Sequence, residues 1–72
     1  MSVNVVSPMP GVITEIFVKV GDKVSTDEDL MILEAMKMEN PIVSPIDGEV
    51  VEIKVQAKEK VKTDQVLAVL KE

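Results

Sequence analysis

Cysteine, histidine, tryptophan and tyrosine are all absent from this chain, and it has a single phenylalanine. Without cysteine or histidine there are no disulfides and none of the usual zinc ligands, so a small core must stabilise the fold. The same absences leave few side chains for acid–base or nucleophilic catalysis, so we expect no catalytic residues and no enzyme activity. The acidic cluster 27–29 lacks calcium-loop spacing, and we expect no metal site.

Positive charge is also scarce. Eight Lys and Arg residues stand against 13 Asp and Glu residues, which gives a net charge of −5. An acidic chain without aromatic stacking platforms is unsuited to binding nucleic acid. No apolar run approaches the ~20 residues that cross a bilayer, and residues 1–4 do not begin a signal peptide. We therefore expect a cytoplasmic protein with no nucleic-acid partner and no membrane insertion.

The sequence contains one pattern twice. Ser44-Pro45 repeats Ser7-Pro8, and Gly48 repeats Gly11 at the same spacing. The further matched pairs are Glu15-Ile16 with Glu52-Ile53, Val18 with Val55, Lys23-Val24 with Lys60-Val61, Thr26-Asp27 with Thr63-Asp64, and Leu30 and Leu33 with Leu67 and Leu70. A repeated half predicts a pseudo-symmetric fold, and 72 residues suit one domain spanning 1–72.

Alternating apolar residues predict short strands and no helix. The side chains predicted to face inward are Thr14, Ile16 and Val18 in the first half and Val51, Ile53 and Val55 in the second. Further strands are predicted over 3–6, 30–35, 38–43 and 66–70. The facing of the continuous apolar runs 30–35 and 66–70 is ambiguous. Pro41 places its strand at a sheet edge or a bulge.

Turn-forming residues separate these strands. Turn signals lie at equivalent places in the two halves, at Pro10-Gly11 and Asp47-Gly48 and again at Gly21-Asp22 and Lys58-Glu59. Segment 26–29 resembles a helix capping box, but no amphipathic run follows it, so we predict a tight loop. About eight short strands at regular spacing predict an all-β sandwich or flattened barrel.

The joint between the repeats is Ala35-Met36-Lys37-Met38. Two predicted strands meet there across Met36-Lys37, a connection with neither Gly nor Asn, the residues favoured in two-residue hairpins. Two methionines at a hairpin tip gain nothing from burial, and their flexible side chains suit a surface that meets several partners. The simpler alternative is a solvated lysine between methionines that cover the end of the core.

The string 34–40, which adds Glu34, Glu39 and Asn40 to this joint, closely resembles the biotin attachment motif of the biotinyl domain family, also called biotin carboxyl carrier protein. Segments 7–11, 18–24 and 44–48 resemble further parts of the family pattern. The resemblance therefore covers nearly the whole chain.

The chain departs from the family pattern in its turns. Many members have Gly where this chain has Asp27, Lys58 and Asp64. Because Asp tolerates a left-handed backbone, we expect both Asp turns to be kept and the loop of Lys58 to be rearranged. Between Phe17 and Leu30 there is no room for the protruding insertion of one class, so the chain resembles the thumbless class.

The resemblance implies a flattened barrel-sandwich of two four-stranded antiparallel sheets with pseudo-two-fold symmetry. It also implies that Lys37 carries covalently attached biotin. The implied attachment motif consists of Ala35, Met36, Lys37 and Met38. Glu34 and Glu39 flank the tip and are implied in ligase recognition, with two solvated edge charges as the alternative.

By the same resemblance the chain is a non-catalytic carrier. Biotin on Lys37 would move CO2 as a swinging arm between carboxylase and carboxyltransferase sites, or away from a substrate in decarboxylases. Its partners would be biotin protein ligase and the biotin carboxylase and carboxyltransferase subunits or domains. One alternative is a lipoyl carrier, which usually has an acidic and a small residue where this chain has Met36 and Met38. Another is an unmodified interaction module of the same fold, which usually separates the halves with a long helical hairpin.

Overall fold

The computed structural model describes all residues 1–72 and consists of eight strands without a helix. The strands are β1 (Ser2–Val6), β2 (Gly11–Ile16), β3 (Lys23–Val24), β4 (Asp29–Ala35), β5 (Met38–Val43), β6 (Gly48–Ile53), β7 (Lys60–Val61) and β8 (Val66–Lys71). The predicted all-β class is confirmed. The chain offers no helix of the length and apolarity needed to span a membrane.

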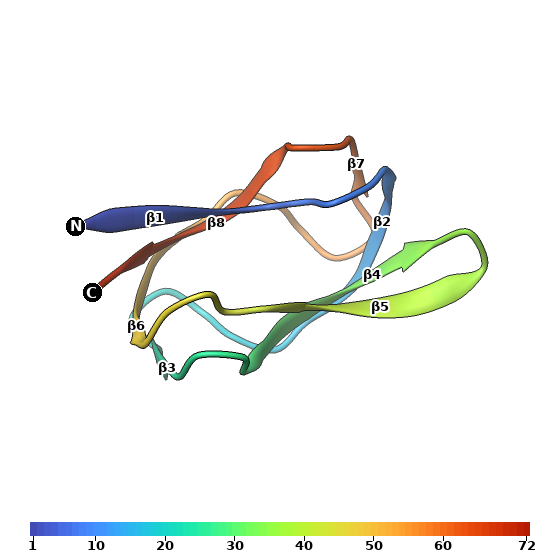
Figure 1. The fold of residues 1–72 in the computed structure, drawn as a ribbon. Coiled ribbons are helices and arrows are strands. Elements are labelled where there is room, and N and C mark those ends of the chain that lie inside the picture. The colour runs from blue at the N-terminus through green and yellow to red at the C-terminus, as the bar shows by residue number, and fades with distance from the viewer.

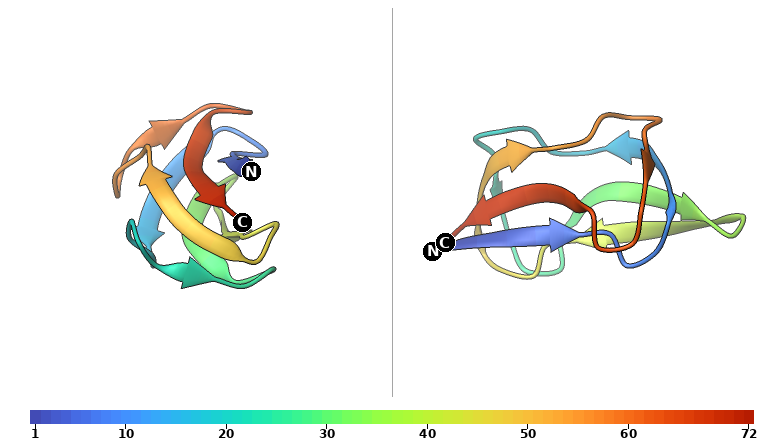
Figure 2. Two further views of the ribbon diagram at one scale, coloured as in Figure 1. Left: turned by 90° about the vertical axis from the view of Figure 1, so that its left-hand side faces the viewer. Right: turned by 90° about the horizontal axis from the view of Figure 1, so that it is seen from above.

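Two four-stranded sheets form a flattened barrel (Figure 1). One has the order β1-β8-β6-β3 and the other β5-β4-β2-β7, with antiparallel pairing throughout. Each strand of the first half corresponds to the strand four places later, so the predicted pseudo-two-fold barrel-sandwich is confirmed. The body measures 32 × 17 × 17 Å, with the β4–β5 hairpin at one end and both termini at the other (Figure 2).

Two fully buried serines tie each half of the chain to the other. The carbonyl of Ser7 accepts a hydrogen bond from the amide of Asp64 at 2.7 Å, and the carbonyl of Ser44 accepts one from the amide of Asp27 at 2.7 Å. Each serine hydroxyl donates to the carbonyl two residues further on, at 2.6 Å. Because burying an unpaired hydroxyl is costly, these bonds explain how the two repeated serines are tolerated in the interior.

A β-bulge in β2 and another in β6 change which side chains face inward. The extra residue is Thr14 in β2 and Val51 in β6. The predicted inward facing of these two residues was wrong: Ile13 and Val50 are fully buried, whereas Val51 is exposed and Thr14 is half-buried. An extra residue shifts the alternation by one position. Inward facing is confirmed further along, for Ile16, Val18, Ile53 and Val55.

A second pair of bulges resolves the two ambiguous apolar runs. Leu30 is the extra residue in β4 and Leu67 is the extra residue in β8. Each bulge lets two consecutive side chains point into the core, so Leu30 and Met31 are both fully buried, as are Leu67 and Ala68. These residues belong to a cluster of 14 buried apolar side chains that forms the core between the sheets.

Left-handed turns are matched between the halves. Asp27 has φ 70° and Asp64 has φ 65°, so both Asp turns are kept as predicted. The rearrangement predicted at Lys58 was wrong. Lys58 has φ 74° and keeps the left-handed conformation of Gly21, its counterpart in the first half, which has φ 98°. The amide of Lys58 donates to the carbonyl of Ile13. This tertiary bond holds the loop in a conformation that lysine itself disfavours.

Candidate functional site

The β4–β5 hairpin projects from one end of the barrel (Figure 1). As predicted, β4 ends at Ala35 and β5 begins at Met38. Met36 has φ 54° and Lys37 has φ 63°, which is the left-handed pair of a type I′ turn. A left-handed backbone costs a residue with a side chain roughly 1–2 kcal/mol, a cost that an Asn-Gly turn largely avoids. The hairpin therefore loses stability by having a methionine and a lysine at its tip.

The side chains around this turn are exposed to solvent. Met36 is 87% exposed and Met38 is 65% exposed, so the alternative in which they cover the core is wrong. Lys37 is exposed as well, and it makes no ion pair, since the single salt bridge of the chain joins Lys54 to Glu52. The amine of Lys37 is therefore open to another protein's active site.

The base of the hairpin is held firmly by the barrel. Ala35, the last residue of β4, is buried. A Cβ on Gly11 would collide with the carbonyl oxygen of Glu34 and lie 3.1 Å from the Cβ of Ala35, so only glycine fits there. The side-chain amide of Asn40 donates to the carbonyl of Met38 at 3.3 Å. The sequence indicated Gly11 as a turn residue, and its close contact with β4 is visible only in the structure.

An unusual row of charges crosses the sheet beside the tip. Glu34 and Glu39 lie directly opposite each other on β4 and β5, and both are exposed. Like charges in this position destabilise an antiparallel pair. The row continues through Val12 on β2 to Lys60 on β7. The hairpin end thus presents, in order, a positive, an apolar and two negative side chains.

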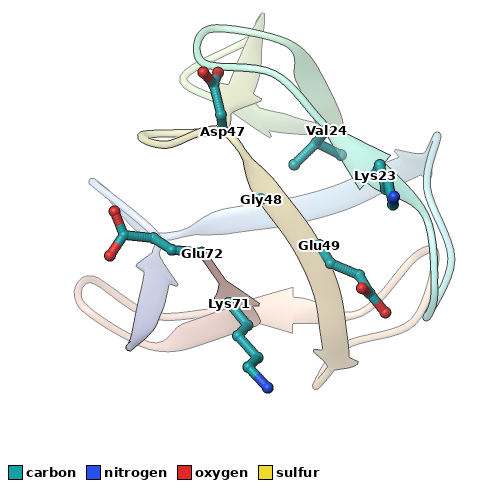
Figure 3. Close-up of a pocket in the computed structure, with 7 residues that line it drawn as sticks. All are labelled: Lys23, Val24, Asp47, Gly48, Glu49, Lys71 and Glu72. Carbon is teal, nitrogen blue, oxygen red and sulfur yellow. The ribbon is translucent and has the colours of Figure 1, made fainter.

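The only pocket of the molecule lies at the opposite end, beside the termini (Figure 3). It has a volume of about 560 Å³ and is lined mainly by β3, β6 and β8. Lys23, Glu49 and Lys71 are successive cross-strand neighbours there, and in Figure 3 their side chains do not converge on a common centre. No group of acidic side chains could hold a metal ion. We therefore place the candidate site at the hairpin.

Asp47 makes a link near this pocket that has no counterpart in the other half. Its carboxylate accepts hydrogen bonds from the amide of Thr26 at 2.7 Å and from the Thr26 hydroxyl at 3.0 Å. The backbone bond first, and the hydroxyl bond second, lower the pKa of Asp47 below its ordinary value of 3.8. The equivalent position is Pro10, whose side chain has no acceptor. No residue pattern in the sequence indicates this contact between distant segments.

Comparison with known proteins identifies the family to which the chain belongs. Residues 3–70 match the family described as biotin-requiring enzymes. A biotin carboxyl carrier protein of Streptococcus mutans is 64% identical over 36 residues, which are 50% of this chain and 28% of that protein. The gamma subunit of glutaconyl-CoA decarboxylase from Acidaminococcus fermentans is 58% identical over 41 residues, or 57% of this chain and 28% of that subunit. The matched segments thus span less than a third of either relative.

The fold agrees with solved structures as well. Urea carboxylase of Kluyveromyces lactis contains a region that superposes with a TM-score of 0.91 at 26% identity, covering 97% of this chain and 6% of that chain. A single-chain, multi-domain long-chain acyl-CoA carboxylase gives a TM-score of 0.90 at 25% identity, covering 96% of this chain and 7% of that chain. The family match extends over nearly the whole chain, and the barrel with its projecting hairpin is the fold expected for it. The chain therefore belongs to the family of biotin-requiring enzymes, as a biotinyl domain.

Proposed function

We propose that this chain is a biotin carboxyl carrier in which the side-chain nitrogen of Lys37 forms an amide with the carboxyl group of biotin. The observation that carries the proposal is the position of Lys37: exposed, without an ion pair and at the apex of a projecting hairpin, within the string 34–40 that resembles the attachment motif. A lysine amine is ordinarily protonated at neutral pH, so a separate ligase must activate biotin and take up the amine proton.

The surroundings of Lys37 fit a group that has to leave the protein surface. The pocket of the molecule lies at the other end, away from the tip that would carry the ring. When bound, biotin supplies a ring nitrogen that takes up and releases a carboxyl group. The chain supplies the support: Ala35 anchors the hairpin in the core, and the long lysine stem extends from it. Tethering raises the effective concentration of the attached group at each site it reaches.

We assign the side chains around Lys37 to recognition by partners. Met36 and Met38 expose apolar surface and are free to contact the active sites that Lys37 enters. Glu34 and Glu39 form a negative pair that attracts a basic surface, and we assign them to the approach of biotin protein ligase. The remaining partners are a biotin carboxylase and a carboxyltransferase or decarboxylase in the cytoplasm. The chain is then a carrier with no catalytic residue of its own.

Intact mass after co-expression with a biotin protein ligase tests the attachment. The wild type should gain one biotin, and Lys37→Arg, which keeps the charge but forms no such amide, should gain none. Lys58→Arg is the matched control, because Lys58 is a second exposed lysine with a left-handed backbone. It should be labelled like the wild type. An unlabelled wild type, or equal labelling of Lys37→Arg, would contradict the assignment.

A further inference from the structure

The outer edge of β1 has unused hydrogen-bonding groups. The amide of Glu72 donates to the carbonyl of Met1 at 3.2 Å, and the amide of Ser7 donates to the carbonyl of Gln65 at 3.0 Å. In an antiparallel ladder every second residue bonds to the same neighbour, so the odd-numbered residues of β1 bond to β8. The backbone groups that point away from β8 belong to Ser2, Asn4 and Val6. β1 is an edge strand that pairs only with β8, and none of the backbone hydrogen bonds outside the strand ladders involves these three residues.

The equivalent edge strand, β5, is protected against pairing. The amide of Ser44 donates to the carbonyl of Glu28 at 2.9 Å, so the even-numbered residues of β5 face β4 and the odd-numbered ones face outward. Pro41 therefore stands at the outward position equivalent to Asn4, where it offers no N–H, and Glu39 adds a charge. Proline and charge are the means by which native edge strands avoid pairing. Strand β1 has neither.

We propose that β1 pairs with β1 of a second copy of this chain, antiparallel about a two-fold axis through Asn4. In this register Asn4 faces Asn4 of the second copy and Ser2 faces Val6, and each facing pair exchanges two hydrogen bonds. All the N–H groups needed are present, and no two charges lie opposite each other. The edge is thus complementary to itself, as a two-fold interface requires.

The side chains support the same register. Val3 faces Val5 of the second copy in a non-hydrogen-bonded pair, the kind in which side chains approach most closely. Val5 is buried in the single chain and Val3 is only half-buried, so pairing covers the rest of Val3. β1 runs from the terminal end towards the hairpin end (Figure 1). Antiparallel pairing therefore points the two Lys37 tips in opposite directions and leaves both accessible.

Sedimentation velocity on the 72-residue chain, from micromolar to millimolar concentration, tests the pairing. The wild type should form a dimer as concentration rises. Asn4→Pro, which copies Pro41 onto β1, should raise the dimer dissociation constant at least about tenfold. Asn4→Ala keeps every backbone group and should dimerise like the wild type. Thermal unfolding checks that each variant is folded, since the amide lost in Asn4→Pro bonds to nothing in the single chain.

A charge-exchange pair tests the axis without proline. Asn4→Lys and Asn4→Glu each place like charges opposite one another, so each should be monomeric alone, while an equimolar mixture should form a heterodimer. A wild type that stays monomeric at millimolar concentration overturns the proposal. So does a mixture that stays monomeric while Asn4→Ala dimerises. Biotin labelling of Lys37 is a separate measurement and is expected to be the same in all these variants.

Discussion

Both ends of the molecule are built from an equivalent pair of strands, β4 with β5 at the hairpin end and β8 with β1 at the terminal end. At the hairpin end the strands are joined through left-handed Met36 and Lys37, and Glu34 faces Glu39. At the terminal end no turn joins β8 to β1, and charges of opposite sign alternate across β3, β6 and β8.

This comparison distinguishes the residues that maintain the fold from the residues that serve the function of the hairpin tip. The repeated serines, bulges and turns occur in both halves, so they belong to the architecture. Two consecutive left-handed residues and two glutamates opposed across a strand pair occur only beside Lys37. Features that cost stability and have no structural return tend to mark functional sites. The comparison therefore points to the hairpin independently of any sequence motif.

The largest effect is expected where the two ends should behave alike. Gly11→Ala and Gly48→Ala each force a Cβ against a backbone carbonyl, that of Glu34 or that of Lys71. Each should lower the free energy of unfolding by about 2 kcal/mol, as overpacking does. Urea unfolding measures both. If one substitution were tolerated and the other disruptive, the two ends would not share the architecture described above.

A smaller effect should reveal the strain at the tip. Met36→Asn places a residue that tolerates the left-handed backbone, and it should raise the free energy of unfolding by about 1 kcal/mol. It should also slow carboxyl transfer from the labelled chain, because the exposed methionine is lost. Lys58→Gly is the control: it relieves a similar backbone strain far from the tip and should leave transfer unchanged. If both variants transferred the carboxyl group at the same rate, the proposed contact of Met36 with a partner would be contradicted.

The opposed glutamates provide a third way to separate the ends. Glu39→Lys converts a repulsive cross-strand pair into an attractive one and should stabilise the chain by about 0.5 kcal/mol. It should slow labelling by the ligase at low salt, and less so at high salt. Glu49→Lys, between Lys23 and Lys71, should destabilise by a similar amount without affecting labelling. If Glu39→Lys were labelled at the same rate as the wild type, the proposed role of the glutamate pair in ligase recognition would be contradicted. The two residues would then be solvated edge charges.

The smallest effect concerns the unmatched link at the terminal end. The pKa of Asp47 is lowered in the folded chain, so its bonds to Thr26 stabilise the fold above its unfolded pKa. That contribution is lost as the pH falls through the lower, folded pKa. Asp47→Asn should therefore be less stable than the wild type at neutral pH, and the difference should shrink below about pH 4. The urea midpoints of the wild type and of Asp47→Asn should be measured across that range of pH. A difference between them that does not change with pH would contradict this account.

The sequence was sufficient to predict the tip and the four strands β1, β4, β5 and β8. Turn residues and apolar alternation are local signals, so β4 and β5 were bounded correctly at Ala35 and Met38. Pro41 was predicted to lie at an edge or a bulge, because a missing N–H is tolerated only there, and β5 is an edge strand.

What the sequence did not reveal depends on contacts between distant segments. The bulges at Thr14 and Val51 are set by the register with neighbouring strands and have no marker residue of their own. Lys58 keeps its left-handed turn because of a bond to the carbonyl of Ile13. The contact between Thr26 and Asp47 joins residues 21 positions apart. The exposure of Lys37 was predicted. The row of side chains from Glu39 to Lys60 could not be predicted, because it depends on the order of the strands in the sheet.

The opposite placement of tip and termini makes the barrel a rigid spacer. Anything joined to Met1 or Glu72 is held a full body length, 32 Å, from the end that carries Lys37. A flexible connection at the termini can be shorter by that amount and still bring the lysine to the same place. Rotation of the barrel about such a connection would sweep the tip along an arc set by the long axis of the protein.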